Sequence, residues 1–133
     1  MIRLRREEAR FALAALAVVG SSLGAACLLA AGPISGLAGM PRDRRFLLGL
    51  RLFGVRELCL GVGLYRAARA DDRRLAGVMT EMLVLSQVLD IGVCVLLAPS
   101  GSISKRTAFG VLSGAPPTVA IALAIRDAYS RGS

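Results

Sequence analysis

Four long apolar stretches constrain this sequence more than any other feature. A helix that crosses a bilayer needs about 20 mostly apolar residues, because ~30 Å of hydrocarbon is spanned at ~1.5 Å per residue. Four stretches reach that length, at residues 11–31, 46–68, 75–98 and 109–125. They predict an all-α fold, in which one domain over residues 1–133 forms an integral membrane four-helix bundle with up-down-up-down topology.

The composition separates this chain from disordered and water-soluble proteins. Hydrophobic residues make up 55% of the 133 residues and charged residues 20%, whereas soluble domains contain about 45–50% apolar residues. The segments between the apolar stretches, 32–45, 69–74 and 99–108, are rich in Gly, Pro, Ser or charge, as connecting loops usually are. The chain is therefore predicted to be a membrane protein.

The first and fourth stretches each carry a feature that complicates a simple helix. The fourth contains Pro116 and Pro117, which remove two backbone donors and predict a kink. The first contains Leu23-Gly24-Ala25-Ala26-Cys27, which faintly resembles a lipoprotein cleavage site. An uncleaved helix is favoured, because the apolar run continues beyond this motif and the preceding arm contains two glutamates.

Basic residues outside the stretches, or at their edges, indicate the orientation of the helices. One side, which holds both termini, carries ten: Arg3, Arg5, Arg6, Arg10, Arg66, Arg69, Arg73, Arg74, Arg126 and Arg131. The other side carries five: Arg42, Arg44, Arg45, Lys105 and Arg106. Because basic residues accumulate on the cytoplasmic side, we expect a multi-pass protein of the cell membrane with both termini in the cytoplasm. The net charge of +8 is interpreted as this topology signal and as a contact with membrane lipids, not as a nucleic-acid-binding surface.

The residue inventory argues against several kinds of catalytic centre. The chain contains no His, which removes His-containing triads, His-ligated haem and most zinc sites. Its three cysteines, Cys27, Cys59 and Cys94, are too widely spaced for a Cys-x-x-Cys motif. We therefore expect neither a metal site nor a cofactor.

Four ionisable residues lie deep inside the second and third stretches, namely Arg51, Arg56, Glu57 and Asp90, whereas Arg66 and Glu81 lie nearer the ends of these stretches. Each costs at least about 2.5–3.5 kcal/mol near the middle of a bilayer. If the two helices are antiparallel about a turn near residues 71–72, Asp90 lies at a depth between the two arginines. The sequence therefore predicts an Arg56–Asp90 or Arg51–Asp90 ion pair, with bidentate geometry as one possibility. The candidate catalytic residues are Arg56, Glu57 and Asp90.

Uncharged polar side chains occur near the middle of the other stretches as well. The first is centred on a Gly20-x-x-x-Gly24 pattern, which permits close approach of a second helix. All four helices would then place polar groups near mid-membrane, which predicts a small polar cavity. The candidate substrate-binding residues are Arg51, Ser86, Gln87, Ser21, Ser22 and Thr118.

One segment resembles a known family. Residues 32–65 contain a small-residue loop that ends in Gly39-Met40-Pro41, followed by the run Gly54-Val55-Arg56-Glu57-Leu58. Together with an acidic residue in the next helix, here Asp90, this pattern resembles the small membrane proteins grouped as domain of unknown function 4267. The resemblance covers about residues 11–125. It implies a four-helix membrane fold and no established reaction.

The favoured hypothesis is a protein that binds a lipophilic small molecule and transforms it by acid–base chemistry. In this interpretation Arg56 and Arg51 orient or polarise an oxygen of the substrate, while Glu57 or Asp90 acts as general acid or base. Isomerisation, cyclisation or epoxide opening would fit, because none of them requires a cofactor.

Two alternatives stay open. The chain could be a structural or accessory membrane subunit, in which the buried charges only fix the register of the helices. It could also be a small proton-coupled transporter, which would be expected to form a homo-oligomer. The transporter is the less favoured of the two, because the first stretch carries no charge and the basic residues favour a single orientation.

Overall fold

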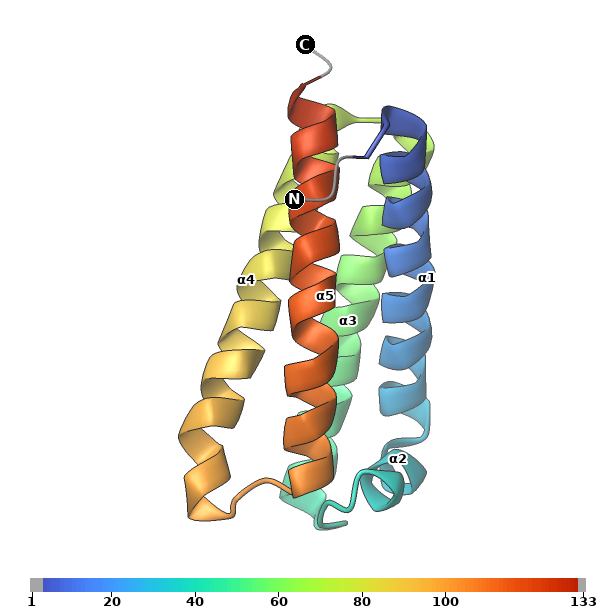
Figure 1. Ribbon diagram of the computed structural model, residues 1–133. Helices are drawn as coiled ribbons and strands as arrows, with labels where there is room; N and C mark the ends of the chain where they lie inside the picture. The colour runs from blue at the N-terminus through green and yellow to red at the C-terminus, as the bar shows by residue number, and fades with distance from the viewer. Residues whose placement is uncertain (1–3, 132–133) are drawn as a thin grey trace.

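The computed structural model describes residues 4–131, which form five α-helices. These are α1 (Arg6–Leu29), α2 (Ala31–Leu37), α3 (Arg44–Ala70), α4 (Arg73–Leu97) and α5 (Lys105–Ser130), with a short 3₁₀ turn, η1 (Ala98–Ser100). The described range contains no strand, so the all-α prediction is confirmed. The long helices alternate in direction, and the start of α1 lies at the same end as the end of α5 (Figure 1). Arg3, which the orientation argument counted, lies outside the described residues.

Three of the long helices have the length and composition of membrane spans. These are α1, α4 and α5, whose apolar windows are mostly exposed on the outside of the protein. Large apolar side chains face outward from them, including Phe11 at 77% exposure, Leu96 at 78% and Phe109 at 75%. An apolar surface of this extent is typical of a lipid-facing protein. α3 is not among the three, since its central turns carry arginine and glutamate.

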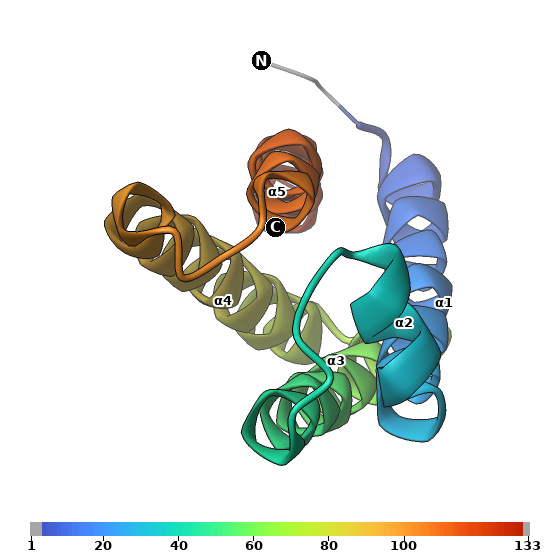
Figure 2. The ribbon, with the colours of Figure 1, turned by 90° about the horizontal axis from the view of Figure 1, so that it is seen from below.

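The segment between the first and second apolar stretches contains a helix that the sequence did not predict. α2 occupies seven residues of what was expected to be a connecting loop, and it lies across the end of the bundle near α1 and α3 (Figure 2). Pro33 falls in its first turn, where the missing amide donor costs nothing. The loop beyond it is closed by Ser35, whose hydroxyl donates to the carbonyls of Met40 (3.1 Å) and Pro41 (2.7 Å).

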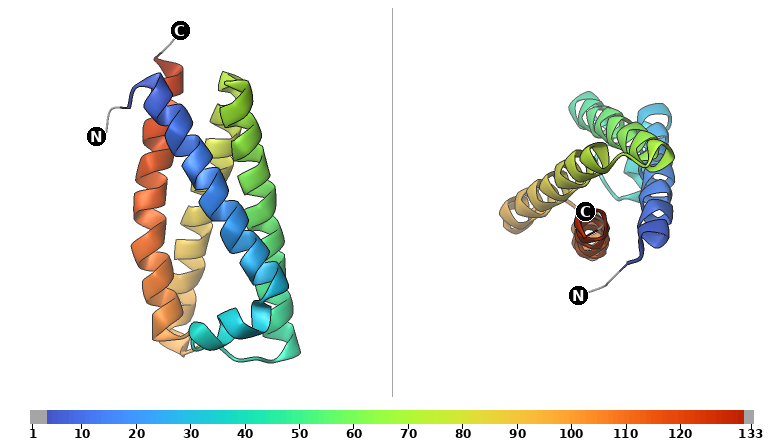
Figure 3. Two further views of the ribbon diagram at one scale, coloured as in Figure 1. Left: turned by 90° about the vertical axis from the view of Figure 1, so that its right-hand side faces the viewer. Right: turned by 90° about the horizontal axis from the view of Figure 1, so that it is seen from above.

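α5 continues through Pro116 and Pro117 as one helix, so the prolines do not end it. The predicted kink is not evident, because the ribbon of α5 has no sharp bend along its length (Figure 3). Hydroxyl donors flank the prolines on both sides. Ser113 donates to the carbonyl of Phe109 (2.7 Å) and Thr118 to that of Gly114 (2.9 Å), whereas the carbonyls that lose an amide donor to the prolines are those of Leu112 and Ser113.

α1 crosses α3 obliquely and at very close range (Figure 3). A Cβ atom on Gly24 would lie 2.7 Å from the carbonyl oxygen of Gly54, and one on Gly61 would lie 2.9 Å from that of Ala17. These glycines therefore allow the two backbones to touch, as the glycine spacing in the first stretch predicted for α1. A Cβ on Gly20 would be farther from α3, 3.8 Å from Glu57.

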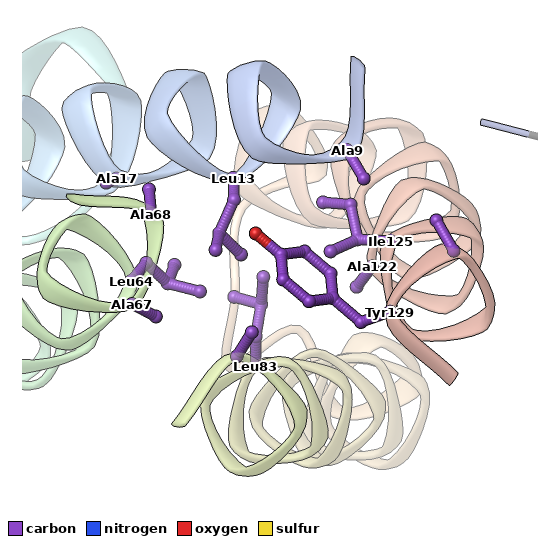
Figure 4. Close-up of a cluster of buried hydrophobic side chains, with 12 residues drawn as sticks. Ala9, Leu13, Ala17, Leu64, Ala67, Ala68, Leu83, Ala122, Ile125 and Tyr129 are labelled. Atoms are coloured by element: carbon purple, nitrogen blue, oxygen red, sulfur yellow. The ribbon is translucent and has the colours of Figure 1, made fainter. Parts of the chain in front are cut away.

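A cluster of buried apolar side chains lies toward the end that holds the two termini. Leu13, Leu64, Leu83 and Ile125 converge there around the ring of Tyr129 (Figure 4). The Tyr129 hydroxyl donates to Oδ1 of Asp71, at the turn between α3 and α4, over 3.3 Å. This cluster joins all four long helices at one end and leaves the middle of the bundle less filled.

Candidate functional site

Arg56 and Asp90 form a bidentate ion pair between α3 and α4. Nη1 of Arg56 donates to Oδ1 of Asp90 over 2.8 Å, and Nη2 donates to Oδ2 over 2.7 Å. The pairing of Arg56 with Asp90 is the first of the two that the antiparallel geometry predicted, and it is confirmed. Planar guanidinium and carboxylate groups held in this way fix the register of the two helices.

The alternative Arg51–Asp90 pair is wrong. Both oxygens of Asp90 are occupied by Arg56, and the Arg51 side chain is exposed. The two arginines are five residues apart on α3, which separates them by about 140° around the helix. Arg51 therefore points away from α4 and from the candidate site.

Glu57 joins the same cluster through its sequence neighbour. Nη2 of Arg56 donates to Oε1 of Glu57 over 2.9 Å, so one nitrogen bridges two carboxylates. The Glu57 side chain is only 7% exposed, against 34% for Arg56 and 26% for Asp90. The sequence did not predict this contact, because neighbouring residues point about 100° apart on a helix. The arginine side chain is long enough to reach the Glu57 carboxylate despite this angle.

The guanidinium of Arg56 contacts an aromatic ring with its face, in addition to the carboxylates bonded along its edge. The ring of Phe53, one turn earlier on α3, lies 4.8 Å from the Arg56 guanidinium carbon, close enough for a cation–π contact. Nε of Arg56 is buried and has no hydrogen-bond partner among the described residues. Arg56 is thus fixed by Asp90, Glu57 and Phe53, and each of its two terminal nitrogens donates to a carboxylate.

A cavity of about 340 Å³ lies between α1, α3, α4 and α5, beside this cluster. Its polar lining side chains are Glu57, Gln87, Asp90 and Thr118. The rest is apolar and includes Leu16, Val19, Leu23, Leu60, Leu64 and Leu83. Arg56 does not line the cavity. A mostly apolar pocket with a few polar groups at one place is the usual form of a small-molecule site.

The remaining predicted binding residues divide into two groups. Gln87 and Thr118 line the cavity. Ser86 does not, since its hydroxyl donates to the carbonyl of Leu83 within α4 (2.9 Å). Ser21 and Ser22 instead line a separate surface hollow of about 300 Å³ between α1 and α3. Ser21 faces Gly61 at the helix crossing, which turns it away from the cavity.

Sequence reasoning missed the residues that create the space itself. Gly110 and Gly114 of α5 line the cavity, and a Cβ added at either position would meet nothing within 4 Å. They stand four residues apart and just before the prolines, so they occupy one face of α5. That spacing was the signal available in the sequence.

The carboxylates of Glu57 and Asp90 line the cavity, whereas the guanidinium of Arg56 does not. Oε1 of Glu57 is held by Arg56, while Oε2 accepts no hydrogen bond from any residue in the described range. A carboxylate with one fixed and one open oxygen can accept or donate a proton at a defined position.

A search of protein-family models, curated proteins and solved structures finds no match to this chain.

Proposed function

We propose that the chain is a multi-pass protein of the cell membrane in which α3 is a fourth spanning helix and both termini are cytoplasmic. α3 has 27 residues, a length of about 40 Å, which is enough to cross a bilayer. Near its midpoint the Glu57 side chain is only 7% exposed, and the charge of the partly exposed Arg56 is paired with the carboxylates of Glu57 and Asp90. The bias of basic residues toward one side and the resemblance to the four-helix family also support this topology.

We further propose that the cavity binds a lipophilic small molecule and that Glu57 exchanges a proton with it. The observation that carries this proposal is the position of Glu57. Its side chain is more than nine-tenths buried, one oxygen is fixed by Arg56, and the residue lines an apolar cavity. A carboxylate placed in this way could remove a proton from one atom of a bound molecule and return it to another, as isomerisation or cyclisation requires.

Arg56 is a positioning residue in this proposal. It does not line the cavity, and its terminal nitrogens are already bonded to Glu57 and Asp90. The sequence-based hypothesis that Arg56 or Arg51 polarises a substrate oxygen therefore has no support from the geometry. Arg56 instead holds in place the Glu57 carboxylate, which exchanges the proton.

A purely structural network is the second candidate function, and one observation favours it. The bidentate pair occupies both oxygens of Asp90 and both terminal nitrogens of Arg56, which is what a register-fixing contact between α3 and α4 needs. In that case the cavity would have no occupant, and filling it would change no activity.

Filling the cavity from α5 separates these two functions. Gly114→Leu is expected to weaken binding of a lipophilic ligand at least about tenfold without lowering thermal stability, because its added Cβ meets nothing within 4 Å. The measurement is a thermal-shift screen of lipophilic compounds on the purified chain, followed by titration of each hit on wild type and variant.

The matched control is Gly92→Leu, at another open glycine position that does not line the cavity. It should leave the affinity of every hit unchanged. If Gly114→Leu binds each hit as tightly as wild type, the cavity is not the binding site and the structural function is favoured.

A further inference from the structure

We infer that the molecule bound in this cavity carries a positively charged amine on an apolar body. This inference rests on the proposed function, because it assigns the chemical class of the ligand that the cavity would take. It follows from the charge of the buried cluster, from the direction of its hydrogen bonds and from its depth in the bundle.

The first step is the charge of the cluster. One guanidinium, that of Arg56, is shared between two carboxylates, those of Glu57 and Asp90. The cluster therefore carries one formal negative charge in excess. The exposed Glu81–Arg126 pair is bonded to itself between α4 and α5, and neither residue lines the cavity. An uncompensated charge with little access to water is costly, and a bound cation would offset it.

The second step is the direction of the hydrogen bonds that the cavity offers. Arg56 does not line the cavity and so offers no donor there, while Glu57 and Asp90 present acceptor oxygens. The hydroxyl of Thr118 donates its hydrogen bond to the carbonyl of Gly114, so toward a ligand Thr118 can act only as an acceptor. Gln87 supplies the one neutral amide among the polar lining side chains. A ligand that donates hydrogen bonds fits this arrangement better than one that accepts them.

The third step is the depth of the site, which indicates the source of the amine. Glu57 stands 13 residues from each end of α3, Arg44 and Ala70, which is about 20 Å from either end. The amine headgroup of a phospholipid stays at the membrane surface and does not reach this depth. The amine therefore belongs to a compact lipophilic molecule that enters between the helices, with its apolar body against side chains such as Leu16 and Leu83.

Three probes of one shape test this inference directly. They are 1-adamantanamine, 1-adamantanol and 1-adamantanecarboxylate, which share an apolar cage and differ only in a cationic, neutral or anionic head. Their affinities are measured at pH 7 by calorimetric titration of the full chain in nanodiscs, with empty nanodiscs subtracted. The amine is expected to bind at least about tenfold more tightly than the alcohol, the ratio that a charge-assisted hydrogen bond supplies. The carboxylate is expected to bind most weakly.

Two isosteric variants add an independent readout. Glu57→Gln keeps an acceptor oxygen for Arg56 but removes the excess negative charge, so the amine should lose about tenfold in affinity while the alcohol changes little. Glu81→Gln removes an exposed carboxylate that does not line the cavity and should alter neither affinity. The comparison of the three probes on wild type needs no variant and stands even if Glu57→Gln fails to fold.

The outcomes distinguish the ligand class from the function on which it rests. If the alcohol binds as tightly as the amine, or the carboxylate binds best, the assignment of a cationic ligand is overturned and the lipophilic cavity stands. If none of the three probes binds, the proposed lipophilic site fails together with the inference.

Discussion

Replacing Arg56 with leucine is expected to destabilise the folded chain by about 3–5 kcal/mol, the cost of leaving a buried carboxylate, here that of Glu57, without its partner. The substitution leaves Glu57 and Asp90 without the guanidinium that bridges them, and Glu57 is only 7% exposed. Both carboxylates would then have to take up protons or draw water into the bundle. The measurement is reversible unfolding of the purified chain in detergent micelles.

Two comparisons make this prediction specific. Arg51→Leu removes an arginine from the same helix but from an exposed position, and should change stability by less than about 0.5 kcal/mol. The triple variant Arg56→Leu, Glu57→Gln, Asp90→Leu should recover most of the loss, because no unpaired charge is left inside. An equal effect of Arg51→Leu and Arg56→Leu would mean that the cluster does not hold α3 to α4.

The second large effect is expected where α1 crosses α3. Gly54→Leu should destabilise the chain by about 3 kcal/mol, because even its Cβ would lie 2.7 Å from the carbonyl oxygen of Gly24, and backbone cannot move aside as a side chain can. The helices would have to separate and lose the contacts on either side of the crossing. The readout is the same unfolding measurement in micelles.

Gly49→Leu is the matched control for this crossing, since it lies on the same helix and a Cβ there meets nothing within 4 Å. It should leave stability unchanged or raise it slightly, because leucine favours a helix more than glycine does. A Gly54→Leu variant as stable as Gly49→Leu would show that α1 and α3 are not packed backbone to backbone.

The sequence limited the main contact of the candidate site to two pairs, Arg56–Asp90 and Arg51–Asp90. Two apolar helices joined by a short turn set the level of every residue along the bundle, so Asp90 could be placed between the two arginines from numbering. The choice between Arg56 and Arg51 could not be made in this way. It depends on how each helix is rotated about its own axis, which is fixed by packing with α1 and α5.

The cavity was harder to predict because it lies where glycines of α5, which have no side chain, leave space between the helices. Gly110 and Gly114 leave space on α5 that no polar pattern reveals. Ser21 and Ser22 of α1, which were predicted to bind substrate, do not line the cavity, and a glycine is again the cause. Gly61 draws α1 so close to α3 that Ser21 is used in the crossing and turned away from the cavity. The level of each residue along the bundle was predictable from numbering, whereas the direction in which each side chain faces was not.

The central claim is that α3 crosses the membrane despite its charges, and labelling of its two ends tests this most directly. Single cysteines are placed at Asp43, which caps the start of α3, and at Asp72, beyond its end. The background replaces Cys27, Cys59 and Cys94 with alanine. In intact cells an impermeant maleimide should label the cysteine at position 43 and should reach that at position 72 only after permeabilisation. Labelling of both positions from the same side would contradict the claim, because α3 would then not span the bilayer.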